Sequence, residues 1–522
     1  MSNSRGREPN YLHLLLLAGY VLLAAGYIGA RFLWNWTSTD DARLTVAAEY
    51  LYAEGTIVPA ETYPFGYAYP ALNAFLSHQT GLSVRTLQVF VQPFLVVLLV
   101  PLAFAAYRNL TGDPAAGALA CIMLFLQPEF LFEAARSSHA KLTWAMALGL
   151  LYALAASFRC AEAGKPIGRW VVLSYLFAFG LTASSVFFSS SYLFAITCAF
   201  GGWLLWRRWG HRQARQRSPL TRLLYVVLSC SVLLYVFIYH IYPPAGGQLS
   251  ILRSIVDQVA MLLLGVEEAT NPYRYVQVAW VSEQVYILLT LFNWTILALS
   301  FSHWALQAKR MAEGRDELPA SQLFLWLLYG GFGLFLAISV VLDLSGALSA
   351  NMQVRAFPHL MVVAIPLAAK ALTGLVRRAG RSAAQALLSG GLVLAVMGFS
   401  LASLLKVTNE PLLSHNWVFY ADPERRAVEW LGQYGEGAQV WTGVDERLVA
   451  LAEANDLWKA RRLKAKWGRP TDRTVYFILS ETMTLRAWRT GMELPEVFPY
   501  NRIYDNHFAA VYRPRASSPY SR

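Results

Sequence analysis

The first residues suited to chemistry are two adjacent carboxylates, Asp40 and Asp41, which follow the first long apolar segment of the chain. A carboxylate at a membrane boundary can accept a proton from an attacking hydroxyl group or bind a cation. The same pair suits the start of a helix, because an acidic side chain there caps backbone N–H groups and favours the helix dipole. Both interpretations stay open, since one acid can cap a helix over 42–53 while its neighbour does chemistry.

A second group of candidate residues is cationic and lies in the polar segments between later apolar runs. An arginine beside an apolar span needs a partner, and its planar fork matches the phosphate or pyrophosphate of a lipid carrier. Alternatively, a long basic side chain extends to the membrane surface without a ligand. The group consists of Arg136, His139, Lys141, Arg253, Arg274 and Arg355.

Aromatic and acidic side chains complete the set. The stretch 63–70 places Tyr63 and Tyr67 among prolines and a glycine, which favour an ordered, non-helical path. Their rings can stack on a sugar ring or form part of the aromatic belt at the headgroup level. Glu283 lies in a later polar segment and can face the same external cavity as Asp40 and Asp41. The histidines show no metal-ligand spacing, so the residues alone predict no metal site.

The composition of the chain indicates whether water or a lipid bilayer surrounds most of it. The chain has 522 residues, of which 56% are hydrophobic and only 15% are charged. Sparse charge between apolar runs of membrane-spanning length indicates an integral membrane protein. This excludes a soluble enzyme, a nucleic-acid-binding domain and a disordered chain. The net charge of +12 indicates no nucleic-acid partner, because much of the excess has a topological explanation.

The apolar runs predict a polytopic α-helical membrane protein with about 11 transmembrane helices. With the N-terminus inside, the inner segments carry roughly 18 lysines and arginines and the short outer loops 6 or 7, which is a clear positive-inside signal. We expect a membrane domain over 1–407 with long outer loops at 34–84 and 242–284. The predicted spans are 11–33, 85–107, 115–133, 141–158, 170–187, 190–206, 222–241, 285–306, 320–342, 356–376 and 385–407.

An odd number of spans places the remaining segment, 408–522, outside the membrane, where its pattern predicts a small α/β domain. Strands are expected at 438–442 and 474–480, with an amphipathic helix over 446–464 and a helix near 481–490. Asp505 and Asn506 lie between two β-rich runs and predict a hairpin. Extended outer loops and an outer domain favour chemistry at the extracytoplasmic face.

Several segments together resemble a known family. The stretch from Asp40 to Gly55, followed by 63–66, resembles the first outer loop of the GT-C membrane glycosyltransferases, most closely the catalytic subunit of oligosaccharyltransferases. Arg136-Ser137 resembles the opening of that family's second outer motif. Val281-Ser-Glu283 resembles its loop motif ending in glutamate, and Met352-Gln-Val-Arg355 resembles its arginine segment. The likeness extends from residue 40 to residue 513.

The resemblance implies a GT-C fold in which polyprenyl-linked sugars react in an outer cavity. Asp40 or Asp41 would activate the acceptor or help to bind a metal, and Glu283 would assist from its loop. The residues assigned to the donor phosphate are Arg136, Lys141, Arg274 and Arg355. Those assigned to the sugar or the acceptor are Tyr63, Tyr67 and His139.

The sequence departs from the family pattern at two places, and these limit the functions expected from the resemblance. The second acidic motif is missing, since Ser138-His-Ala-Lys141 stands where acids are expected, and a lysine there argues against a bound Mg²⁺ or Mn²⁺ ion. The tail has Trp441-Thr-Gly-Val-Asp445 in place of the family's tryptophan-tryptophan-aspartate motif, so asparagine-linked glycosylation is not expected.

The expected function is transfer of a sugar from a polyprenyl-phosphate-linked donor to an extracytoplasmic acceptor, which is a protein, a lipid or a polysaccharide. The enzyme would lie in the plasma membrane, with a cytoplasmic N-terminus and no cofactor. Two alternatives remain: a catalytically inactive GT-C-like scaffold subunit, and a transporter of lipid or polysaccharide.

Overall fold

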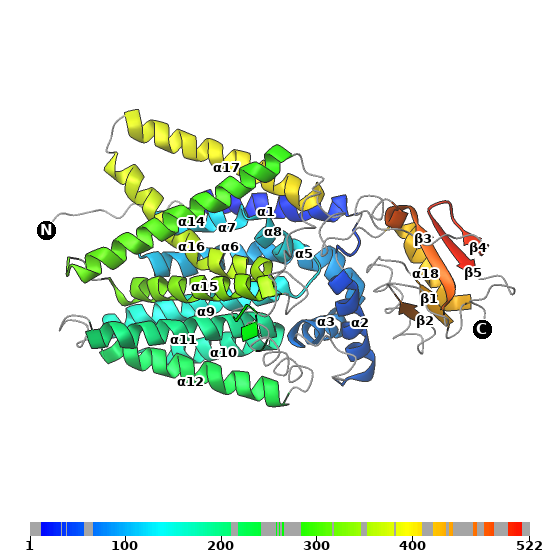
Figure 1. The fold of residues 1–522 in the computed structure, drawn as a ribbon, viewed down its shortest axis with the longest axis horizontal. Helices are drawn as coiled ribbons and strands as arrows, with labels where there is room; N and C mark the ends of the chain where they lie inside the picture. Colours follow the sequence, from blue (N-terminus) through cyan, green and yellow to red (C-terminus); the bar gives the residue numbers. More distant parts are fainter. Residues whose placement is uncertain are drawn as a thin grey trace.

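A computed structural model of the chain shows an elongated helical bundle with a small β-sheet beyond one end (Figure 1). Two helices, α2 (Thr39–Glu54) and α3 (Ala68–Thr80), lie between the bundle and the sheet. The residues that the structure describes are 12–32, 34–37, 39–56, 66–209, 218–241, 257, 260–261, 264–265, 283–315, 318–345, 352–379, 383–409, 421–434, 438–441, 463–466, 474–484 and 500–513.

Each of the predicted apolar runs contains helix. The second run is continuous from Val84 to Thr111 but passes through a π-helical turn, η1, and a 3₁₀ turn, η2. The bounds are α1 (Leu12–Arg31), α4 (Val84–Thr86), η1 (Leu87–Val91), α5 (Gln92–Leu95), η2 (Val96–Leu98), α6 (Leu99–Thr111), α7 (Pro114–Phe125), α8 (Pro128–Ala135), α9 (Ala140–Glu162), α10 (Gly168–Ser184), α11 (Val186–Trp209), α12 (Ser218–Ile241), α14 (Glu283–Ala312), α15 (Ala320–Ser345), α16 (Met352–Arg378) and α17 (Ala383–Asn409).

The number of helices fit to cross a membrane is lower than the predicted 11. Among the described residues, 8 helices are long and apolar enough, or 9 when the bent pair α7–α8 counts as one span. The difference lies in α10 and α12. With 17 residues, α10 is short for a hydrocarbon core about 30 Å thick, because a helix rises about 1.5 Å per residue. The helix α12 has 24 residues, but the apolar stretch whose side chains are described there is shorter, Thr221–Phe237.

The run predicted as one span at 115–133 is a bent pair of helices, with 74° between α7 and α8. The bend follows from Pro128, which lacks a backbone N–H group and disfavours the helical conformation of the residue before it. Gln127 is accordingly extended, with ψ 115°. As a result α8 turns away from α7; it carries Glu133 and ends just before Arg136.

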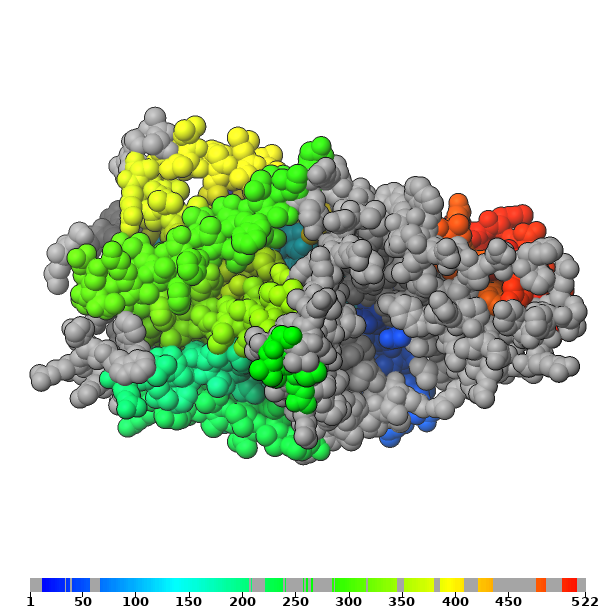
Figure 2. Space-filling model, viewed as in Figure 1, coloured from blue at the N-terminus to red at the C-terminus, as the bar shows by residue number. Residues whose placement is uncertain are grey.

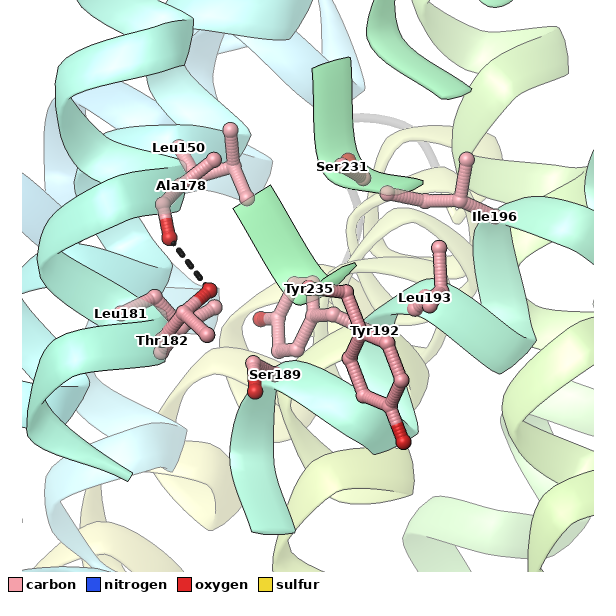
Figure 3. Close-up of a pocket in the computed structure, with 10 residues that line it drawn as sticks. All are labelled: Leu150, Ala178, Leu181, Thr182, Ser189, Tyr192, Leu193, Ile196, Ser231 and Tyr235. Atoms are coloured by element: carbon pink, nitrogen blue, oxygen red, sulfur yellow. Dashed lines mark hydrogen bonds between the residues drawn. The ribbon is translucent and has the colours of Figure 1, made fainter. Parts of the chain in front are cut away.

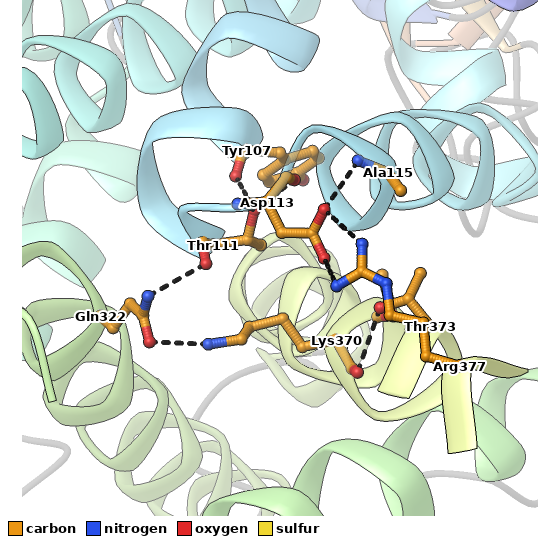
Figure 4. A network of polar contacts seen from close by, with 9 residues as sticks. Tyr107, Thr111, Asp113, Ala115, Gln322, Lys370, Thr373 and Arg377 are labelled. Carbon is orange, nitrogen blue, oxygen red and sulfur yellow. Dashed lines mark hydrogen bonds and ion pairs between the residues drawn. The ribbon is translucent and has the colours of Figure 1, made fainter. Parts of the chain in front are cut away.

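Polar side chains join the turn after α6 to the neighbouring helices (Figure 4). Asp113 caps α7 and forms an ion pair with Arg377 of α16, with an N–O distance of 2.7 Å. Lys370 Nζ donates to Gln322 Oε1 at 2.7 Å, and Gln322 Nε2 donates to the carbonyl oxygen of Thr111 at 3.1 Å. These contacts tie the turn between α6 and α7 to α15 and α16.

The tail contains a mixed five-stranded sheet in the order β2-β1-β3-β5-β4. The strands β1 (Ala438–Trp441), β2 (Leu463–Lys466) and β3 (Thr474–Ser480) are parallel, and β5 (Ala509–Arg513) pairs antiparallel with β3 and with β4 (Asn501–Asp505). The predicted strands and the hairpin are confirmed.

The helix predicted over 446–464 is wrong at its end, because residues 463–464 belong to β2, which pairs with β1; residues 446–462 lie outside the described part. The helix α18 (Asp422–Tyr434) was not predicted, although its Asp-Pro-Glu start is a helix signal. The helix expected near 481–490 is described only to residue 484, where it is helical. The loop 242–284 lies largely outside the described residues. Residues 407 and 408 both belong to α17, which ends at Asn409, so the domain boundary placed between them stays a prediction.

The tail packs on the first outer loop. Ala427, Val428 and Leu431 of α18 share one buried apolar cluster with Trp36, which precedes α2, and with Ala42 of α2 itself. Figure 2 shows α2 (blue) in the hollow between the membrane helices and the red strands of the tail. The tail therefore completes the hydrophobic support of the helix that carries Asp40 and Asp41.

We predict that Leu431→Ala loosens this docking. Removing a fully buried leucine costs about 2–5 kcal/mol, so limited proteolysis should cut between the membrane domain and the tail faster than in the unaltered protein. Gln433→Ala, at an exposed position two residues further on, is the control and should leave the cleavage rate unchanged. Equal rates for the two variants would contradict the proposed support.

Candidate active site

Asp41 is fully buried at the start of α2. Its Oδ2 accepts hydrogen bonds from the backbone N–H of Thr37 at 3.0 Å and from the Thr37 hydroxyl at 2.7 Å. This arrangement resembles a capping box, in which an acid in the first turn bonds back to the residues before the helix. Asp41 therefore holds the entry to α2, while Asp40, the next residue back, is partly exposed.

A buried polar network extends from α2 into the second span. The Thr45 hydroxyl lies 2.8 Å from the carbonyl oxygen of Asp41 and 2.5 Å from Gln88 Oε1, in the π-helical turn η1. The Tyr69 hydroxyl donates to Gln92 Oε1 at 2.5 Å and lies 2.9 Å from the carbonyl oxygen of Ser137. The extra residue of the π-helical turn changes which side chains face α2 and α3, which explains two glutamines buried near the outer end of an apolar span.

Arg136 follows α8 and is only 6% exposed. One of its terminal nitrogens donates to Glu133 Oε2 at 2.6 Å, and its guanidinium lies over the Phe132 ring. Its Nε and its other terminal nitrogen are buried, and among the described residues neither has a hydrogen-bond partner. Burial opposes the charge of Arg136, but Glu133, Asp41 and Asp40 together raise its pKa, so it stays a cation.

Lys141 and His139 lie beside Arg136. Lys141 is 8% exposed, and its Nζ donates to the carbonyl oxygen of Arg136 at 2.5 Å. Burial, and then the charge of Arg136, lowers the pKa of His139 to about 3, so this imidazole is neutral at physiological pH. The structure thus brings Asp40, Asp41, Arg136, His139 and Lys141 into electrostatic contact in one cluster, which we name the outer charged cluster together with Glu133.

The structure describes the other predicted site residues only in part. Tyr67 is partly buried directly before α3, whereas Tyr63 and Arg274 lie outside the described residues, as does the side chain of Glu283 at the start of α14. Arg355 is exposed in the first turn of α16, and no described contact joins it to the outer charged cluster. Its predicted role in binding the carrier phosphate stays a prediction. Within the described part of the chain, no group of His, Cys, Asp or Glu side chains could hold a metal ion.

Two acids of this region were not predicted from the sequence. Glu133 stands three residues before Arg136, where an i,i+3 ion pair is an ordinary helix contact. Asp343 is fully buried near the end of α15, and its two carboxylate oxygens accept the N–H groups of Met352 and Gln353, each at 2.8 Å. An acid inside the apolar run 340–344 was the available signal for Asp343. It caps α16 directly before Arg355.

Because His139 is neutral in the folded protein, we predict that the protein loses stability in acid. The unfolded chain binds a proton near pH 6.5 and the folded chain only near pH 3, so stability is lost as the pH falls through this window. We expect His139 to contribute about 1–2 kcal/mol to the loss between pH 6.5 and pH 5. Thermal unfolding of the purified protein and of His139→Gln across this range measures the effect, and identical slopes would contradict it.

No protein-family model and no curated protein matches the chain. Solved structures do share its fold. ArnT from Cupriavidus metallidurans in the apo state is 13% identical over 96% of this chain and 97% of that chain, with a TM-score of 0.51. The oligosaccharyltransferase AglB from Archaeoglobus fulgidus, in complex with an inhibitory peptide and a dolichol-phosphate, is 12% identical over 92% and 71%, with a TM-score of 0.54. The chain is therefore an integral membrane protein with the GT-C fold of membrane glycosyltransferases, as the resemblance of its outer motifs predicted.

Proposed function

We propose that the protein transfers a sugar from a polyprenyl-phosphate-linked donor to an acceptor at the extracytoplasmic face of the plasma membrane. In this orientation the N-terminus is cytoplasmic, and the tail lies on the side of the outer charged cluster. The distribution of lysine and arginine along the sequence supports this orientation.

One observation carries the proposal. Arg136 is a buried cation with two nitrogens that have no partner among the described residues, and it lies beside Lys141 and a pair of aspartates. A buried guanidinium with unused donors suits a phosphate oxygen, because the charged hydrogen bonds offset the cost of its burial. A nearby carboxylate suits the proton of an acceptor hydroxyl.

The reaction that these groups support is a direct displacement. A carboxylate at Asp40 or Asp41 takes the proton of the acceptor hydroxyl, and the freed oxygen forms a bond to the anomeric carbon of the sugar. The bond from that carbon to the phosphate oxygen breaks, and its electron pair stays on the polyprenyl phosphate. Arg136 and Lys141 stabilise the charge that develops on this leaving group.

The proposal of a polyprenyl-phosphate-linked donor rests on the chemistry of the charged residues and on the shared fold. AglB, which has this fold, was solved with a dolichol-phosphate, a lipid that carries the same headgroup as the proposed leaving group. Arg274 and Arg355 are the predicted further ligands of the phosphate, and Glu283 is the predicted assisting acid. Tyr63 and Tyr67 are the predicted aromatic contacts of the sugar or the acceptor.

We predict that Asp40→Asn lowers the transfer rate by about 10²–10⁴-fold, because an amide cannot accept the hydroxyl proton. The measurement is transfer of radiolabelled sugar from a synthetic polyprenyl-phosphate donor by the purified protein. The double variant Asp40→Asn, Asp41→Asn should abolish transfer. Glu54→Gln, an exposed acid at the other end of α2, is the matched control and should keep full activity.

Thr37→Val distinguishes the two roles of the acid pair. It removes the hydroxyl that bonds to Asp41 Oδ2 and leaves both carboxylates in place. A small loss of rate with Thr37→Val and a large loss with Asp40→Asn would assign chemistry to Asp40 and anchoring to Asp41. Full activity of the double aspartate variant would remove both acids from the mechanism.

We further predict that transfer continues in the presence of EDTA. Lys141 and Arg136 supply positive charge at the place where a divalent ion would lie, and the acids that would bind such an ion are missing after Ser137. Rates measured with excess EDTA and with added Mg²⁺ or Mn²⁺ should agree within a factor of about two. Loss of activity with EDTA and its recovery with Mn²⁺ would show that this expectation is wrong.

The inactive scaffold remains the alternative within the same fold, because the second acidic motif of the resembled family is missing. Binding of the polyprenyl-phosphate donor without turnover under every acceptor condition would favour it. Transport of the lipid without chemical change would favour the transporter.

A further inference from the structure

His359 lies about two turns into α16, is 1% exposed and is enclosed by aromatic rings. The nearest ring, that of Phe188, has its centroid 4.0 Å from the imidazole centroid. An imidazole in such apolar surroundings needs partners for both ring nitrogens. The other enclosing rings are those of Phe187, Trp144, Phe332 and Tyr192, at 5.5, 5.8, 6.3 and 6.5 Å.

One ring nitrogen of this histidine has a partner. His359 Nδ1 lies 2.7 Å from the Ser191 hydroxyl oxygen, which also lies 2.8 Å from the carbonyl oxygen of Phe188. This contact leaves Nε2 as the ring nitrogen that can bind a further group. Nε2 is buried, and among the described residues it has no hydrogen-bond partner.

A second unused nitrogen lies on a neighbouring ring. The indole Nε1 of Trp144 is also buried and has no partner within the described part of the chain. The ring centroids of Trp144 and His359 are 5.8 Å apart. One O–H group placed between the two rings would accept from Trp144 Nε1 and would donate to, or accept from, His359 Nε2.

The place of these two rings connects them with the outer charged cluster. Trp144 follows Lys141 by three residues on α9, which puts both on one face of the helix. The Phe130 ring of α8, the helix that carries Glu133, lies 5.1 Å from the Trp144 ring. Tyr192 also lines a small pocket between α9, α10, α11 and α12, together with the hydroxyl-bearing Ser189 and Thr182 (Figure 3).

We propose that Trp144 and His359 form a subsite that binds an O–H group one helical turn below the outer charged cluster. The group is either an ordered water molecule or a hydroxyl of the substrate, which share this chemistry. The subsite follows from two buried nitrogens, on neighbouring rings, that have no partner among the described residues. The water form is independent of the proposed sugar transfer, whereas the substrate form rests on it.

The first test is the thermal stability of His359→Phe in the absence of any substrate. Phenylalanine fits an aromatic enclosure but also removes the Nδ1 partner of Ser191, so its Tm is compared with that of Ser191→Ala, which loses the same Nδ1 contact. Relative to that variant, an empty subsite predicts an unchanged or raised Tm. A bound water that loses its His359 partner predicts a Tm lowered by about 2–5 °C. His303→Phe is the matched control, because His303 also has a buried Nε2 without a described partner but lies elsewhere, on α14, and its Tm should not fall.

Trp144→Phe provides a second test if His359→Phe folds poorly. Trp144→Phe removes the donor together with part of the ring volume, so it should lower the Tm by at least as much as His359→Phe does. The double variant should lower it by no more than Trp144→Phe alone, because both changes remove the same bridging group. Additive losses in the two variants would indicate separate packing defects and would overturn the subsite.

Donor addition distinguishes the two sources of the O–H group. A substrate hydroxyl predicts an unchanged Tm, relative to Ser191→Ala, for His359→Phe without substrate, together with at least about tenfold weaker binding of a polyprenyl-phosphate-linked hexose and unchanged binding of polyprenyl phosphate alone. Unchanged Tm and unchanged binding of both lipids would overturn the proposal. A failure of sugar transfer itself would leave the substrate-free measurement valid.

Discussion

The outer face of the membrane domain depends on the cost of burying one guanidinium group. A charge of this size in a medium of low dielectric constant loses several kcal/mol of hydration, which only nearby opposite charge and hydrogen bonds can offset. Glu133 provides a direct ion pair with Arg136, and Asp40 and Asp41 add longer-range attraction. Because those acids come from different segments, the position of Arg136 is set by how α2 and α8 are held.

Each of those segments is held in place by a common structural feature: a proline bend, a capping acid or an apolar contact. Pro128 creates the bend that releases α8 from the line of α7, and α8 carries Glu133 and ends just before Arg136. Thr37 anchors Asp41, and the cluster formed by Trp36, Ala42 and the tail helix α18 supports α2 from the other side. Precise placement of the charges therefore relies on contacts that are themselves uncharged, as is usual for a preorganised site.

The helices of the membrane domain could be predicted from the sequence, because long apolar runs follow directly from the thickness of the bilayer. Asp40, Asp41, Arg136, His139 and Lys141, which the structure brings into one cluster, could be selected because they are polar residues beside apolar spans. Glu133 was missed because it precedes the motif in which acids were sought. The strand at 463–466 was missed because four residues carry little periodicity and gain their pairing only from β1.

Charge balance gives the last constraint on how such a cluster can act. The described cluster contains three carboxyl groups, the guanidinium of Arg136 and the amine of Lys141, with His139 neutral. A phosphate group entering it adds further negative charge, and in a buried site that excess is costly unless more positive charge lies nearby. Arg355 is exposed at the capped end of α16, within the first turn of that helix. The same balance of charge is the physical reason why Arg355 and Arg274 are predicted as further ligands of the phosphate and why a second acidic motif would disfavour its binding.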